Sequence, residues 1–193
     1  MMQDLLPNTI EYFQTAKENQ FFDRKSAKIK PDDIVRHIVA FANASGGTLV
    51  IGIENDGRIT GFRATGANNI EHFKNIAIKR LTITPVPVRC SEMPVKNEKG
   101  EEDLVLVLDV PASNNKVIQS FDHEVYLRQN DESVKLNYDQ RTQLLYDKGQ
   151  RYFEDEVVER SSLDDVDEEI IELYRNHMGL PSKPAREILE ARG

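Results

Sequence analysis

The spacing of apolar residues switches along the chain between a helical and a strand-like period. From residue 34 to 42 apolar positions recur every three or four residues, which is typical of a helix with one buried face. The same spacing returns from residue 70 to 81. The sequence therefore predicts helices over residues 9–18, 31–45, 70–81 and 138–148, one opening near 162, and a short last one over 185–192.

Continuous apolar runs rich in branched residues predict buried strands. The run TLVIGIE, residues 48–54, precedes the turn Asn55-Asp56-Gly57 and an extended return segment at 58–61, which together predict a hairpin. A second hairpin is predicted from residues 88–95 and 103–111, and single strands from 21–25 and 124–128. Helices interspersed with strands and hairpins predict an α/β or α+β fold with a mixed sheet.

Charge is unevenly distributed along the chain, whose formal net charge is −8. Ten acidic residues and a single arginine lie between Glu154 and Glu172, whereas the other 23 acids and 24 bases nearly balance. The overall acidity therefore does not argue against a basic patch elsewhere. The change in composition predicts a main domain over 1–153. Residues 154–193 are predicted to form an acidic helical linker or the start of a further C-terminal region.

Several classes of protein are disfavoured by what the sequence lacks. No apolar run approaches the roughly 18 residues that a bilayer span needs, so we predict a cytoplasmic protein without a membrane partner. The single cysteine, Cys90, allows neither an internal disulfide nor a thiolate zinc site of its own. Neither nucleotide-binding glycine fingerprint occurs, and the Gly46-Gly47 pair lies between a helix end and a strand start. ATP binding is therefore not expected.

Acidic residues flank two of the predicted strands. Glu18 and Asp23 surround the start of the first strand, and Glu54 and Asp56 follow the second. If these strands are neighbours, the carboxylates converge and can hold Mg²⁺ or Mn²⁺ for phosphodiester cleavage. The alternative is ordinary structure, in which Asp56 serves a turn and Asp23 pairs with a nearby base.

Basic residues cluster around the same first strand. Arg24, Lys25, Lys28, Lys30 and Arg36 lie within thirteen positions, which suits phosphate contacts that are independent of nucleotide sequence. Two further bases extend the cluster if their segments lie alongside: Lys116 and Arg128. A solvated surface is the alternative interpretation.

The order of these motifs resembles the Schlafen-type AlbA-like domain. The matching features are Glu18, then DRK at residues 23–25, AFANASGG at 40–47 and TLVIGIENDGRITGF at 48–62. LVLDVPAS and VYLRQ are similar to the later strands of the family, and the resemblance covers residues 9–149. We interpret the signature residues as structural rather than chemical; they are Asn43, Gly46, Gly47, Gly52 and Gly57.

The resemblance implies an α/β fold and nucleic-acid binding, most often described for DNA, as in bacterial predicted transcriptional regulators. Some of these are labelled as related to ATP-dependent helicases, although no Walker motif occurs here. Our first hypothesis is therefore a nucleic-acid-binding regulatory module.

Animal members that are metal-assisted ribonucleases imply an alternative, in which Glu18, Asp23 and Glu54 are the metal-binding catalytic acids. Asp at 23, Arg at 24 and Asn at 55 depart from that pattern. A third hypothesis is an oligomerising scaffold whose acidic tail recruits a partner. The AlbA-like resemblance also implies a homodimer or a higher oligomer.

Overall fold

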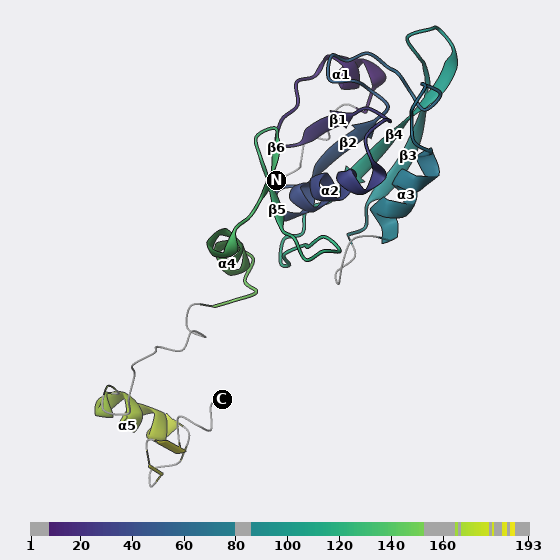
Figure 1. Cartoon of the computed structure of the whole chain (residues 1–193). Coiled ribbons are helices and arrows are strands. Elements are labelled where there is room, and N and C mark those ends of the chain that lie inside the picture. Colours follow the sequence, from purple (N-terminus) through teal and green to yellow (C-terminus); the bar gives the residue numbers. More distant parts are fainter. Residues whose placement is uncertain are drawn as a thin grey trace. The chain divides into compact units, whose positions relative to one another are not determined.

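A four-stranded mixed sheet forms the centre of the N-terminal part of the chain in the computed structural model (Figure 1). Its strands are β1 (Phe22–Lys25), β2 (Gly47–Ile51), β4 (Glu102–Val110) and β3 (Arg89–Lys96), in that spatial order. β1 and β2 run parallel, and the other pairs are antiparallel. The predicted mixed α/β fold is confirmed.

The structure describes residues 8–79, 86–152, 165, 167–177, 179, 183–184 and 186–187. The chain divides into two units, Met1–Tyr152 and Phe153–Gly193, and each is described by itself. Within the described residues, no helix is both long and apolar enough to cross a bilayer.

Both faces of the sheet are covered by apolar side chains. On one face, Leu49 of β2 and Leu106 of β4 pack against α2 (Ile34–Asn43) and α3 (Ile70–Lys79). On the other face, Val50 and Val107 pack against the aromatic rings of α1 (Ile10–Thr15). A sheet buried on both sides explains why β2 and β4 read as unbroken apolar runs instead of alternating ones.

A second, smaller sheet packs against α2. It consists of β5 (Tyr126–Gln129) and β6 (Glu132–Lys135), and α4 (Tyr138–Asp147) follows it. Asn130 has a φ of 54°, a conformation that Asn tolerates and that lets the chain reverse within two residues. β6 was not predicted, because its sequence ESVK contains only one apolar residue.

Two predicted elements are shorter than expected. The first helix spans Ile10–Thr15 instead of 9–18, with Thr9 as its N-cap. The return segment after β2 forms only one isolated bridge, between Ile53 and Ile59. Gly52, with a φ of 109°, ends the strand before a regular hairpin develops.

The predicted helix over 31–45 is a one-turn 3₁₀ helix, Pro31–Asp33, followed by α2. In the second unit, α5 spans Glu168–His177. The predicted start of that helix near 162 lies outside the described residues, as does most of the predicted helix over 185–192.

β3 occupies one edge of the sheet and pairs only with β4 there. Pro94 lies in the middle of this strand, and the exposed charged residues Arg89, Glu92 and Lys96 are distributed along it. Pro lacks a backbone N–H, and charged side chains disfavour pairing with a further strand.

Gly57 provides the first test of the fold. Its φ is 88°, and a Cβ added there would lie 2.3 Å from the carbonyl oxygen of Gln14. We expect Gly57→Ala to lower the free energy of unfolding by about 2 kcal/mol or more, since it combines backbone strain with a clash against α1. Urea denaturation followed by circular dichroism measures the loss.

Gly66→Ala is the matched control. Gly66 has a φ of 85°, but no atom lies within 4 Å of an added Cβ. Its substitution carries the conformational cost alone, about 1 kcal/mol. Equal losses in the two variants would contradict the role of Gly57 as a close-packing position.

Candidate nucleic-acid interface

A fully buried ion pair joins the two sheets of the first unit. Nη1 of Arg128, on β5, donates to Oδ2 of Asp23, on β1, at 2.8 Å, and neither side chain is exposed to solvent. A buried charge that loses its partner is strongly unfavourable. The pair therefore constrains where β5 and β6 lie relative to β1.

The guanidinium of Arg128 makes further contacts that fix its position. Its Nε and Nη2 donate to the backbone oxygen of Asn19 at 3.1 and 3.0 Å, and Nη2 donates to that of Phe22 at 3.3 Å. The group also stacks 4.8 Å from the ring centre of Phe41 on α2. Arg128 thus links β5 to the loop before β1, to β1 itself and to α2.

His37 completes the buried cluster from α2. Nε of Arg36 donates to Nε2 of His37, so the proton of the neutral imidazole lies on Nδ1. This Nδ1 lies 3.2 Å from Oδ2 of Asp23 and 3.0 Å from Oγ of Ser133. Because both groups face the same nitrogen, the arrangement differs from a Ser-His-Asp catalytic triad.

The carboxyl of Asp23 remains ionised inside the protein. Burial alone would favour the neutral acid, but hydrogen bonds from His37 and Lys25 outweigh it and hold the pKa of Asp23 well below its usual range. Burial also lowers the pKa of His37, despite the neighbouring carboxylate. The cluster therefore combines an anion, a neutral imidazole and an arginine.

Lys25 and Glu18 form the outer edge of this cluster. Nζ of Lys25 pairs with Oδ1 of Asp23 and lies 3.5 Å from Oε1 of Glu18. Burial and the charge of Asp23 raise the pKa of Glu18, although Lys25 opposes the shift. Two carboxyls with opposite pKa shifts therefore lie side by side at β1.

Arg24 has a structural role instead of the predicted phosphate contact. Its side chain points to the opposite face of the sheet, where Nη1 donates to the backbone oxygens of Phe13 and Gln14 and Nη2 to that of Ala16, each at 2.7 Å. These carbonyls lie at the C-terminal end of α1 and lack helical partners. Arg24 is buried and therefore not available to a ligand. Arg128 is buried as well, so the predicted phosphate contact of Arg128 is also replaced by a structural role.

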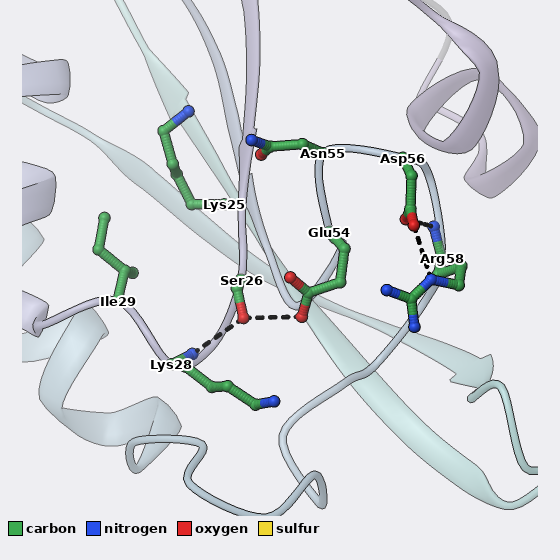
Figure 2. A pocket seen from close by; sticks show the side chains of 8 residues that line it. All are labelled: Lys25, Ser26, Lys28, Ile29, Glu54, Asn55, Asp56 and Arg58. Atoms are coloured by element: carbon green, nitrogen blue, oxygen red, sulfur yellow. Dashed lines mark hydrogen bonds and ion pairs between the residues drawn. The ribbon is translucent and has the colours of Figure 1, made fainter.

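An open groove of about 590 Å³ lies where β1 and β2 end (Figure 2). Glu54 lies on it, and Oε1 of this residue accepts hydrogen bonds from the hydroxyls of Ser26 and Thr60, both at 2.8 Å. The Lys28 and Arg58 side chains extend on either side of the Glu54 carboxylate in Figure 2.

The three predicted metal-binding acids are divided between these two places. Glu18 and Asp23 are adjacent, whereas Glu54 is held by hydroxyls in the groove. Across the described part of the chain, no group of three or more His, Cys, Asp or Glu side chains has an arrangement that holds a metal ion. Asp56 serves the turn and pairs with Arg58.

Two exposed bases of the predicted cluster, Lys28 and Lys30, lie in the loop after β1, and a third, Arg36, lies on α2. The side chains of Lys28 and Lys30 are exposed, and neither has an acidic partner among the described residues. Lys116 is also exposed, but its segment is tied to the C-terminal end of α2, because Asn43 bonds to both backbone groups of Ile118. Lys28 and Lys30 precede the other end of α2, so Lys116 does not extend their cluster.

His37, Ser133 and Thr60 were not predicted as site residues. The helical spacing of the apolar residues places His37 on the buried side of α2, one turn after Ile34, and that signal was available in the sequence. Ser133 lies on the unpredicted strand β6, and Thr60 contacts Glu54 only because the chain folds back at Gly57. The sequence around Ser133 and Thr60 contains no pattern that marks either residue as part of a site.

A family model matches this chain over residues 18–137, and its description is Schlafen, AlbA_2. The chain belongs to the Schlafen AlbA_2 family. The matched region takes in both residues of the buried ion pair and the whole groove. Membership of the Schlafen AlbA_2 family suggests a function related to nucleic acid.

Other comparisons add little to the Schlafen AlbA_2 assignment. No curated protein sequence matches the chain. Among solved structures, the chain is similar to the DIP2311 protein from Corynebacterium diphtheriae, with 20% identity and a TM-score of 0.46. The similarity covers 87% of this chain and 35% of that one, so the chain spans about a third of that protein.

Removal of Arg128 tests the buried ion pair. We expect Arg128→Met to lower the free energy of unfolding by about 3–5 kcal/mol, since Asp23 is left buried beside fewer positive charges. Chemical denaturation measures the change. Arg89→Met is the control, because Arg89 is exposed and its nearest carboxylate oxygen, on Asp109, lies 3.9 Å away. A similar loss in both variants would refute the central role of Arg128.

His37 predicts a pH dependence of stability. Because the pKa of His37 is lowered from 6.5 in the folded protein, the unfolded chain binds more protons as the pH falls below that value. The free energy of unfolding should therefore decrease from pH 7 towards pH 5. Glu18, whose pKa is raised, contributes with the opposite sign at lower pH.

The contribution of His37 is isolated by subtraction. The difference between wild type and His37→Gln should shrink as the pH falls through this window, whereas the exposed His72 gives a reference variant, His72→Gln. Denaturant titrations at half-unit pH intervals measure both differences. Parallel pH profiles for wild type and His37→Gln would exclude His37 as the source.

Proposed function

We propose that this domain binds nucleic acid through the phosphate backbone, with the loop between β1 and α2 as its main contact. The observation that carries the proposal is a pair of exposed lysines, Lys28 on the open groove and Lys30 two residues further along the same loop. Family membership supports a nucleic-acid partner in general terms.

The chemistry of the groove suits a polyanion that carries hydroxyl or amino groups. Lys28 and Arg58 offer positive charge on its two sides, and the acids that pair with Arg58 among the described residues, Asp56 and Glu98, are solvent-exposed. Exposed ion pairs of this kind are weak and exchange readily for phosphate. The Glu54 carboxylate, held by two hydroxyls at one oxygen, lies between them as a hydrogen-bond acceptor.

Buried arginines contribute to this function indirectly. Arg24 and Arg128 hold β1 in place from opposite faces of the sheet, and the lysine loop begins directly where β1 ends. A loop fixed at its origin loses less conformational entropy when it binds. A role in regulating transcription stays a prediction of the family resemblance, as does the metal-dependent ribonuclease alternative.

Paired substitution of the loop lysines tests the proposal. The affinity of Lys28→Ala/Lys30→Ala for a labelled DNA duplex should fall at least tenfold at low salt. The slope of log affinity against log salt should also decrease by about 2, because about one counterion is released per phosphate contact. Fluorescence anisotropy at several salt concentrations measures both effects, with single-stranded RNA as a second probe.

Arg89→Ala is the control for loss of an exposed positive charge elsewhere on the sheet. Arg89 is exposed and pairs in register with Asp109, near the start of β2 and thus at the opposite end of the sheet from the groove. Its affinity and salt slope should equal those of wild type. The proposal fails if neither probe shows salt-sensitive binding, or if Arg89→Ala weakens binding as much as the double variant.

A further inference from the structure

Asn68, in the segment between β2 and α3, binds the backbone of the loop that carries Lys28 and Lys30. The N–H of Asn68 donates to the oxygen of Ala27 at 2.8 Å. Its side-chain amide donates to the oxygen of Ile29 at 2.9 Å, and makes longer contacts to those of Lys28 and Ala27 at 3.4 and 3.5 Å. One residue, 39 to 41 positions away in the sequence, therefore contacts three successive carbonyl groups of the loop.

The remaining carbonyl groups of this loop are also hydrogen-bonded within the protein. The oxygen of Ser26 accepts from the N–H of Ile29 at 3.1 Å, and that of Lys30 accepts from the N–H of Asp33 at 2.9 Å. Together with the groups that Asn68 binds, every carbonyl oxygen from residue 26 to 30 accepts a hydrogen bond. The loop backbone therefore follows a defined path, although loops are usually the more mobile parts of a domain.

The side chains of the loop alternate between the core and solvent. Ala27 is buried and Ile29 packs against the apolar core that includes α2, whereas Lys28 and Lys30 are exposed. A rotation of the backbone that turned Lys28 inward would break the bonds to Asn68 and bring Ile29 into solvent. The contacts of Asn68 thus determine which side chains of the loop face a ligand.

We infer that Asn68 is a positioning residue for phosphate binding, because its amide holds the loop in the conformation that presents Lys28 and Lys30. The inference rests on the proposed function of this loop. Asn68 acts through the two lysines and does not itself contact the phosphate. A loop that is already held in its binding conformation loses less entropy when a nucleic-acid backbone binds.

Asparagine is suited to this position by its chemistry. Its side-chain amide carries two N–H donors, so one group can serve several carbonyl oxygens. The amide is also uncharged, and it therefore leaves the positive charge of the loop to the lysines. Asn68→Ala removes both donors but keeps the backbone bond from residue 68 to Ala27.

The first measurement requires no ligand. The N–H groups of Lys28 and Ile29 donate to the hydroxyl and the carbonyl oxygen of Ser26 at 3.3 and 3.1 Å, and the bond from Lys28 is drawn in Figure 2. In Asn68→Ala, hydrogen exchange of these two amides should be at least tenfold faster, because the loop opens more often. Nuclear magnetic resonance measures the rates, and unchanged exchange would overturn the inference.

Asn69→Ala is the matched control, since it removes the same side chain one position further along. Asn69 is exposed, and its Oδ1 accepts from the N–H of Glu71 at 2.8 Å, so it supports the start of α3. Exchange at Lys28 and Ile29 should stay within twofold of wild type. Circular dichroism verifies that both variants are folded. Equal acceleration in both variants would point to a general loosening of the segment and would contradict the role of Asn68.

Affinity for the labelled DNA duplex tests whether the ordered loop matters for binding. Asn68→Ala should weaken binding about fivefold, which corresponds to one ordinary hydrogen bond, and Asn69→Ala should bind as wild type does. In the Lys28→Ala/Lys30→Ala background, Asn68→Ala should change the affinity by less than twofold, since the lysines it positions are gone. An equal loss with and without the lysines would show that Asn68 acts elsewhere.

The outcomes separate this inference from the proposed function. If wild type shows no salt-sensitive binding to the duplex or to single-stranded RNA, the proposed function fails whatever the exchange rates are. If wild type binds and Asn68→Ala binds equally well, the proposed function stands and only the positioning role of Asn68 is overturned.

Discussion

The ion pair between Asp23 and Arg128 is the contact on which the first unit depends, because two charges without solvent contact tolerate few arrangements of the surrounding backbone. The pair connects residues 105 positions apart in the sequence. It attaches the β5–β6 sheet to β1, and His37 adds α2 to the same contact. Three elements therefore share one polar centre within an otherwise apolar core.

The side chains of β1 point alternately to the two faces of the sheet, so its two bases are separated. Asp23 and Lys25 point towards α2, whereas Phe22 and Arg24 face α1, as the alternation of a strand requires. The charged side chains of Asp23 and Arg24, which the sequence alone would place on the surface, are thus buried. The bases that remain for a ligand lie outside this strand. Lys28 and Lys30 are in the loop after it, where alternation no longer directs every second side chain inward, and Arg58 lies on the groove.

Periodicity was sufficient to predict the central sheet and the helices that cover it, because β2, β4, α2 and α3 bury long apolar stretches. It failed at β6, where the pairing depends on the turn at Asn130 more than on apolar residues. The basic cluster was only partly predicted. The sequence showed that Arg24, Lys25 and Lys28 lie close together, but the burial of Arg24 and the partial burial of Lys25 depend on carbonyls and carboxylates that only the folded chain brings to them.

Contacts between distant segments also explain why the roles of Glu18, Asp23 and Glu54 could not be predicted from the sequence. The sequence placed Glu18 and Asp23 around the start of the first strand, and they meet because the chain turns between them. Glu54 is oriented by Ser26 and Thr60, which reach it from two different segments. Hydroxyl residues are common and have no characteristic spacing, so only the folded chain identifies this pair.

The edge strand β3, with Pro94 at its middle and charges along its length, has a consequence for how this protein meets other chains. Main-chain pairing gives nearly the same affinity whatever the side chains are, so an open edge would make the sheet a general template for association. With that edge closed, association at β3 depends on individual side chains at defined positions. Specificity at this edge can therefore change by single substitutions while the backbone of the sheet remains the same.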